Sequence, residues 1–437
     1  MIKQKELGVS TNFHYQSGFG NFFESESLEG SLPKGRNSPQ KVSFGLYAEQ
    51  LSGSAFTLPR KSNLRSWLYR IRPSVVHGSY KKFEKNVLAS APLNRVVTPE
   101  QYRWSPRPIP DKKTDFVEGL MSVAAHGDVV GQTGAAIHLY HCNAPMAQRS
   151  FVNADGEFLL LPQEGDLFVK TELGLLEVSP GEVVLIPRGM KFQVHPHGKS
   201  SRGYICENYG APFELPDLGP IGSNGLASAR DFLCPVANYE DIDEEHELVT
   251  KFSGNLWTCP LNHSPFDVVS WHGNYVPFKY DLSKFNTIGT VSFDHPDPSI
   301  FTVLTSKSGT PGVANVDFVI FPPRWMVGED TFRPPYYHRN IMSEYMGLIH
   351  GVYDAKEEGF MPGGGSLHNC MSAHGPDAET FKKASEVSLE PQKIDKTLAF
   401  MFESKSPWVL TKEAETASFR QKDYLNCWKG LPKNFKG

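Results

Sequence analysis

Residues 155–197 read DGEFLLLPQEGDLFVKTELGLLEVSPGEVVLIPRGMKFQVHPH, and this segment alternates short apolar runs with turn signals. Each turn signal contains a glycine, at positions 156, 165, 174, 181 and 189. The apolar runs 158–161, 167–170, 175–178, 182–186 and 191–194 suit strands and are too short for typical helices. Short strands separated by frequent turns predict an antiparallel β-sandwich or barrel.

Within this segment, Gly181, Pro187 and Gly189 reproduce the G-x5-P-x-G part of the second cupin motif. Cupins are double-sheet jelly rolls, so the spacing predicts a mainly β, cupin-like architecture, a double-stranded β-helix. At the position where that motif has a metal-binding histidine, the chain has Phe192, and the upstream HxH is replaced by Asn-Ala-Asp at 153–155. We therefore expect a degenerate, metal-free cupin-like core here.

The chain of 437 residues exceeds the size at which single cores usually stop growing, so two domains are expected. A second β-rich stretch begins near residue 287 and includes runs 301–305, 318–321 and 346–353. A boundary in the polar stretch 279–285 divides an N-terminal domain, 1–283, from a C-terminal domain, 284–437. Helices are expected at the periphery, at 239–251, at 378–385 after Asp377, and at 412–428 after Thr411.

Composition excludes several functional classes. The formal net charge of -4 and pI of about 6.4 provide no basic surplus for phosphates, so nucleic acid is not expected as a partner. The first 20 residues have no apolar core of a signal peptide, and no run of about 18 apolar residues predicts a membrane span. The six cysteines lack any CxxC pair, which indicates reduced thiols and a cytoplasmic location.

Residues 336–374 carry the densest set of chemically active side chains. They include four histidines, at 338, 350, 368 and 374, together with Glu344, four tyrosines and a PGGG loop at 362–365. His338, Asn340, Glu344 and Gly351 follow the spacing of the first cupin motif, with Asn340 in place of its second histidine. A further histidine is expected from a later strand. Two imidazoles and one carboxylate are the donor set of non-haem Fe(II) oxygenases, although zinc accepts the same ligands.

The sequence also resembles a known family over nearly its whole length. Residues 322–377, PPRWMVGEDTFRPPYYHRNIMSEYMGLIHGVYDAKEEGFMPGGGSLHNCMSAHGPD, are similar to the active-site region of homogentisate 1,2-dioxygenases. Four other blocks agree in register: YQSGFGNFFESE at 15–26, LYAEQLSGSAFTLPR at 46–60, RSWLYRIRPSV at 65–75 and FDHPDPSIFTVLTSKSG at 293–309.

This resemblance implies specific site residues. It assigns Fe(II) ligation to His338, Glu344 and His374, the catalytic base to His295, and substrate contacts to Tyr353 and again His374. It also implies that homogentisate and O2 are converted to maleylacetoacetate in tyrosine and phenylalanine catabolism, by a homo-hexamer built as a dimer of trimers. His295 suits a base because imidazole, with an unperturbed pKa of about 6.5, is largely neutral at cytosolic pH.

Two choices stay open at this point. The cupin spacing G-x2-H selects His368 as the last ligand, whereas the resemblance selects His374; we expect His374 to bind the metal and His368 to support the site. The rival functions are a zinc cupin with hydrolase or isomerase activity, a non-catalytic β protein that binds sugar or stores nitrogen, and a dioxygenase acting on gentisate instead of homogentisate.

Overall fold

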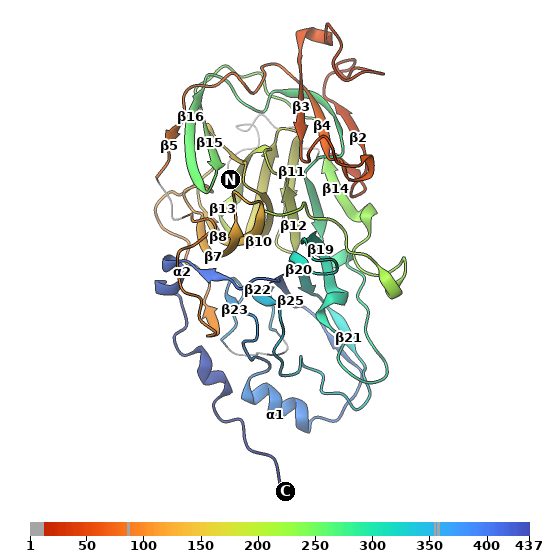
Figure 1. Ribbon diagram of the computed structural model, residues 1–437, viewed down its shortest axis with the longest axis vertical. Coiled ribbons are helices and arrows are strands. Elements are labelled where there is room, and N and C mark those ends of the chain that lie inside the picture. The colour runs from red at the N-terminus through yellow and green to blue at the C-terminus, as the bar shows by residue number, and fades with distance from the viewer. Residues whose placement is uncertain (1–12, 85–87, 354, 356–358) are drawn as a thin grey trace.

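The computed structural model describes residues 13–84, 88–353, 355 and 359–437, which form a mainly β protein (Figure 1). In this described part, the largest sheet has 14 strands. Ten follow one path: β1 (Tyr15–Ser17), β14 (Phe232–Pro235), β18 (Phe278–Asp281), β12 (Glu182–Ile186), β10 (Glu157–Thr171), β13 (Lys191–Asn208), β9 (Arg149–Asn153), β15 (His246–Phe252), β16 (Asn255–Leu261) and β5 (Lys81–Lys82). The others are β11 (Gly174–Val178), β7 (Met121–Asp128), β8 (Thr133–Cys142) and β26 (Val409–Leu410).

Three smaller sheets complete the β structure of the described residues. One contains β2 (Phe23–Glu26), β17 (Val268–Gly273), β4 (Arg65–Arg70) and β3 (Tyr47–Ser52). The second contains β19 (Thr302–Lys307), β20 (Ala314–Phe321), β25 (Leu398–Ser404), β22 (Ser343–His350), β23 (Gly365–His368) and β6 (Tyr102–Trp104). The third pairs β21 (Arg324–Met326) with β24 (Gln392–Ile394). The mainly β prediction is confirmed.

Helices are few and short in the described part of the chain. The α-helices are α1 (Ala378–Glu386) and α2 (Lys412–Thr416), and 3-10 turns cover Ser43–Gly45, Arg60–Ser62, Gly219–Ile221, Ala229–Asp231, Leu282–Lys284, Pro298–Phe301 and Tyr424–Trp428. Asp377 and Thr411 cap α1 and α2 by accepting from the backbone N–H three residues on, so both predicted caps are confirmed. The helix predicted at 412–428 is wrong beyond Thr416. No helix among the described residues has the length and apolar character that a membrane span requires.

Two predictions in the N-terminal half need correction. The runs 158–161 and 167–170 are two halves of one bent strand, β10, because the turn signal at Gly165 is a bulge in its pairing with β13. The helix predicted at 239–251 is wrong. Its acidic part lies in an exposed loop, and the strand β15 begins at His246.

The second β-rich stretch also shifts at its edges. The run 318–321 lies within β20, but Phe301 ends a 3-10 turn and β19 starts at Thr302. The predicted strand 346–353 is displaced toward the N-terminus as β22, which ends before Gly351, where φ is +81°. The proposed boundary 279–285 lies on the end of β18 and the following 3-10 turn.

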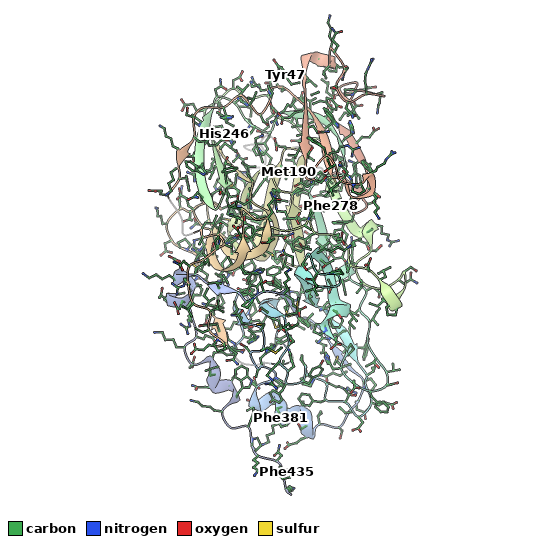
Figure 2. All side chains as sticks on the ribbon, in the orientation of Figure 1. Tyr47, Met190, His246, Phe278, Phe381 and Phe435 are labelled. Carbon is green, nitrogen blue, oxygen red and sulfur yellow. The ribbon has the colours of Figure 1, made fainter. Side chains whose placement is uncertain are left out.

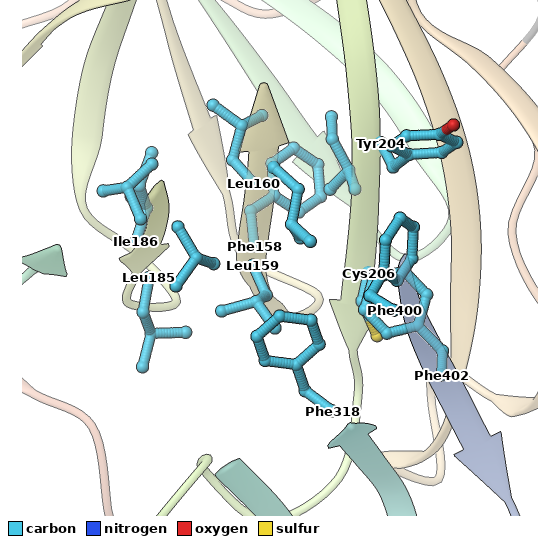
Figure 3. Packing of buried hydrophobic residues seen from close by; sticks show 14 of the residues in the cluster. Phe158, Leu159, Leu160, Leu185, Ile186, Tyr204, Cys206, Phe318, Phe400 and Phe402 are labelled. Carbon is cyan, nitrogen blue, oxygen red and sulfur yellow. The ribbon is translucent and has the colours of Figure 1, made fainter. Parts of the chain in front are cut away.

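The two halves share one core. Aromatic and aliphatic side chains from β10, β12 and β13 pack against Phe318, Phe400 and Phe402 of the second sheet (Figure 3). The rings of Tyr204 and Phe400 lie 4.8 Å apart, and the Tyr204 hydroxyl donates to a carbonyl, that of Gly364, at 2.7 Å. Figure 2 shows side chains filling the interior continuously between Tyr47 near one end and Phe381 of α1 near the other.

Each half also contributes a strand to the other's sheet. β6, from the first third of the chain, pairs with β23 at the edge of the second sheet. In return β26, close to the C-terminus, pairs with β7 of the large sheet. The edges of both sheets are therefore completed by residues distant in sequence.

A buried polar network occupies the N-terminal barrel where the degenerate cupin motif was expected. Phe192 is buried among aromatic rings, 5.5 Å from Phe151. The Lys251 ammonium lies 2.7 Å from a Glu207 carboxylate oxygen and 2.8 Å from one of Asp155, and all three side chains are almost fully buried. A lysine thus supplies the positive charge that these two carboxylates require inside the barrel.

Candidate metal centre

Three of the predicted site residues meet at one end of the second sheet. Glu344 lies on β22, His338 precedes that strand, and His374 follows β23. The backbones of His338 and His374 exchange hydrogen bonds of 3.0 and 3.1 Å, which fixes the two histidines side by side. One ligand atom from each of the three side chains lies within 4.8 Å of the other two.

Hydrogen bonds to the backbone orient both imidazoles. The Nδ1–H of His338 donates to the Tyr336 carbonyl at 2.7 Å, and that of His374 donates to the Ser372 carbonyl at 2.9 Å. In both rings Nε2 therefore turns toward Glu344, at 3.7 Å for His338 and 3.0 Å for His374. Backbone bonds of this kind fix the tautomer that presents Nε2 to a metal ion.

The surroundings of Glu344 favour its ionised carboxylate form. Burial would raise its pKa, but hydrogen bonds from His338 and His374, with charge on His374 and His368, hold that pKa well below its usual range. Asn340 donates its side-chain N–H to Glu344 Oε1 at 2.6 Å and so fixes the carboxylate's rotation. Two neutral nitrogen donors and one anionic oxygen on one side of a small volume fit a divalent transition-metal ion.

His368 lies beside this cluster but points elsewhere. It is opposite Glu344 in the pairing of β22 and β23, and its ring stacks on His374 with centroids 4.2 Å apart and an angle of 10°. Its Nε2 lies 2.8 Å from the Tyr424 hydroxyl. His368 therefore supports the ring of His374, and the ligand cluster of the described residues contains His374 instead.

A cavity of about 380 Å³ opens onto the three clustered side chains. His295 and Tyr353 also line it, so all five predicted site residues face one space. The Nδ1–H of His295 donates to the Pro296 carbonyl at 2.8 Å, which leaves the lone pair of that imidazole on Nε2. Tyr353 is buried against the ring of Phe321.

The structure adds a row of acidic side chains that sequence reasoning missed. Asp317 on β20, Glu403 on β25 and Glu344 on β22 are directly opposite one another in consecutive strand pairs, so they face the same side of the sheet. Burial, with Glu344 and Asp317 nearby, raises the pKa of Glu403 to about 8, and burial raises that of Asp317 to about 6. Glu403 is the second-last residue of an apolar strand, LAFMFES, and only the pairing register reveals its place.

A second missed feature joins the two loops of the site. The Tyr336 hydroxyl donates to Asp297 at 2.9 Å, and Asp297 lies two residues after His295. The carbonyl of the same tyrosine accepts the bond from His338. Tyr336 thus connects the loop that contains His295 to the loop that contains His338.

Comparison with known proteins identifies the family. A model of the homogentisate 1,2-dioxygenase N-terminal region matches residues 14–282, and one of the C-terminal region matches residues 283–435. Among solved structures, the chain is similar to oxalate decarboxylase from Bacillus subtilis, with 11% identity, 78% of this chain and 86% of that chain covered, and a TM-score of 0.31. It is also similar to a cupin barrel protein from Leptotrichia buccalis, with 8% identity, coverage of 68% and 91%, and a TM-score of 0.27. The two family matches together span nearly all of the chain, which therefore belongs to the homogentisate 1,2-dioxygenase family of oxidoreductases.

Proposed function

We propose that this enzyme is an Fe(II)-dependent ring-cleaving dioxygenase that converts homogentisate and O2 to maleylacetoacetate. The observation that carries the proposal is the cluster of His338, Glu344 and His374 at the floor of a cavity, in a chain of this family. The reaction balances without a further reductant, because both atoms of O2 enter the product. We place the reaction in tyrosine and phenylalanine catabolism.

Iron fits the three proposed ligands better than a metal with a fixed requirement for four protein donors. Two imidazoles and a carboxylate leave open positions for substrate oxygens and O2, whereas closed structural zinc sites use four protein ligands. The chemistry that a bound ferrous ion supplies here is electron transfer between the substrate ring and O2. His338 and His374 would bind through Nε2, since both Nδ1–H groups donate to backbone carbonyls.

The protein's own groups prepare the substrate. His295 can accept the proton of the hydroxyl beside the acetate chain, at its Nε2 atom, because Nδ1 already carries a hydrogen. Loss of that proton makes the ring electron-rich and the oxygen a good ligand. Tyr353 can donate a hydrogen bond to the substrate from the cavity wall, and His374 lines the same space.

Further parts of the proposal concern the setting of the enzyme. We propose a homo-hexamer assembled as a dimer of trimers, a cytoplasmic location, and an N-terminal domain 1–283 with a catalytic domain 284–437. The exchange of β6 and β26 means that these domains would share sheet edges. We expect neither nucleic acid nor membrane among the partners.

Oxygen consumption tests the proposal against its rivals. The metal-free protein is loaded anaerobically with Fe(II) or Zn(II), and O2 uptake is then followed with homogentisate and with gentisate. We expect uptake only with iron and homogentisate. Turnover with zinc, or preference for gentisate, would contradict the proposal. His350→Ala is a suitable control variant that should keep the O2 uptake of the wild-type enzyme, because His350 lies in the same segment as the proposed ligands but is exposed at the end of β22.

A further inference from the structure

Glu403 is an acidic side chain of the cavity that has no role in the proposed reaction. It is opposite Glu344 in the pairing of β22 with β25, and it lines the same cavity. Neighbouring strands lie about 4.8 Å apart, so its carboxyl group is next to the ligand cluster. It does not belong to the three-residue cluster of ligand atoms found among the described residues.

Three other polar side chains of the cavity have protein partners. Tyr336 donates to Asp297, Asn340 donates to Glu344, and His368 lies within hydrogen-bond distance of Tyr424. In the described part of the chain, the carboxyl group of Glu403 makes no hydrogen bond and no ion pair, and the residue is only partly exposed. A carboxyl group without a protein partner at the wall of a cavity is available to bind a substrate hydroxyl.

The surface beside Glu403 suits an aromatic ring. Met346 and Met401 are opposite each other in the same strand pair, two residues from Glu344 and Glu403 respectively, so they face the same side of the sheet. Both line the cavity. Methionine sulfur and methyl groups make favourable contacts with aromatic rings. The sheet wall therefore presents an apolar patch with a ligand carboxylate and a second carboxyl group along one edge.

We propose that Glu403 binds the second hydroxyl of the substrate, the one remote from the acetate chain, and thereby selects a para-dihydroxy ring over a monophenol. The inference rests on the proposed function, which assigns the other hydroxyl to the ligand cluster and His295. A hydroxyl buried without a partner loses its hydrogen bonds to water, so a carboxyl at this place favours the ligand that carries the hydroxyl.

Anaerobic binding to the iron-loaded enzyme tests the inference without turnover. Dissociation constants are measured by titration calorimetry for homogentisate and for 2-hydroxyphenylacetate, which keeps the acetate and the first hydroxyl but lacks the second. We expect the wild-type enzyme to prefer homogentisate by roughly 10- to 100-fold, the range when a buried polar group loses its hydrogen-bond partner. In Glu403→Leu the preference should fall to about threefold or less, while Glu403→Gln, which can still form the bond, should retain part of it.

Two comparisons separate this role from a structural one. Asp317→Asn changes the neighbouring carboxyl of the same row, which does not line the cavity, and should leave the preference intact. Iron content is measured in every variant. A Glu403→Leu enzyme that weakens both ligands equally, or keeps the wild-type preference, overturns the inference. If that variant does not fold, the two ligands are compared in the wild-type enzyme, where equal affinity for both would also overturn the inference.

The proposed function fails by a different result. Wild-type enzyme loaded with iron that consumed no O2 with homogentisate would refute the reaction, whatever its binding preference. Oxygen uptake combined with an unchanged preference in Glu403→Leu would refute only the role of Glu403.

Discussion

The proposed roles of His374 as a metal ligand and of His368 as a supporting ring can be tested by replacing each ring separately. His374 directs Nε2 at Glu344 from 3.0 Å, whereas His368 directs Nε2 at the Tyr424 hydroxyl and contacts His374 only by stacking. His374→Ala should therefore remove a ligand, and His368→Phe should keep the stacked ring while removing its nitrogens. The two variants should differ strongly in iron affinity.

The size of the difference follows from typical metal-site energetics. A four-ligand structural site binds its metal with about 10–16 kcal/mol, or about 2.5–4 kcal/mol for each ligand. Loss of one ligand from the proposed triad should then weaken iron binding by roughly 100- to 1,000-fold, since about 1.4 kcal/mol corresponds to a factor of ten. Loss of a group that only supports a ligand typically costs about 10- to 100-fold in affinity or activity. Because the phenyl ring preserves the stacking, we expect the loss of iron affinity in His368→Phe to lie near the lower end of that range, at about 10-fold.

Anaerobic Fe(II) titration with a competing chelator measures both affinities, and metal analysis after gel filtration gives the iron retained. We expect His374→Ala to emerge nearly free of iron and His368→Phe to retain most of it with reduced turnover. If His368→Phe lost its iron while His374→Ala kept a full equivalent, the ligand assignment would be wrong and the cupin spacing would have indicated the correct histidine.

Three further outcomes are expected. His295→Gln should keep its iron but slow ring opening by roughly 10²- to 10⁴-fold, the usual effect of removing a positioned base, as single-turnover O2 uptake will show. Lys251→Met should lower the free energy of unfolding in urea by about 3–5 kcal/mol, because it leaves two buried carboxylates without a cation, while Lys34→Met in an exposed ion pair should cost at most about 1 kcal/mol. Burial, with Lys405 nearby, lowers the pKa of His126 to about 3, so the unfolded chain takes up its proton first as pH falls below about 6.5. The free energy of unfolding should therefore decline by about 1.4 kcal/mol per pH unit from this group alone. In His126→Gln, the free energy of unfolding in urea, measured between pH 6 and 4, should change less steeply with pH by that amount.

Local patterns predicted a strand well where the apolar run and the turn signals beside it coincide with the observed strand and turns. The run 182–186 coincides with β12, and the caps Asp377 and Thr411 lie where the sequence indicates. The errors arose where tertiary pairing outweighs local signals. The glycine at 165 has the appearance of a turn, but its backbone makes a bulge because β13 pairs with β10 on both sides of it. Similarly, 246–251 is a strand because β9 and β16 pair with it.

The candidate site was predictable to the extent that its residues lie in one segment or in a recognised motif. His338, Glu344, His374, Tyr353 and His295 were all named from the sequence, and all five line one cavity. Glu403 and Asp317 could not be named, because a lone acidic residue in an apolar strand has no local signature. Their relation to Glu344 exists only through the alignment of three strands, which one sequence does not specify.

The exchanged strands determine when the protein can finish folding during synthesis. β6 leaves the ribosome long before its partner β23. β7 likewise cannot pair with β26 until residues 409–410 have been synthesised. Until then the growing polypeptide carries unpaired strand edges that favour association with other chains. Premature termination before Val409 would leave the large sheet unfinished, so even a late stop codon should yield a chain recognised by chaperones and proteases although every proposed metal ligand is present.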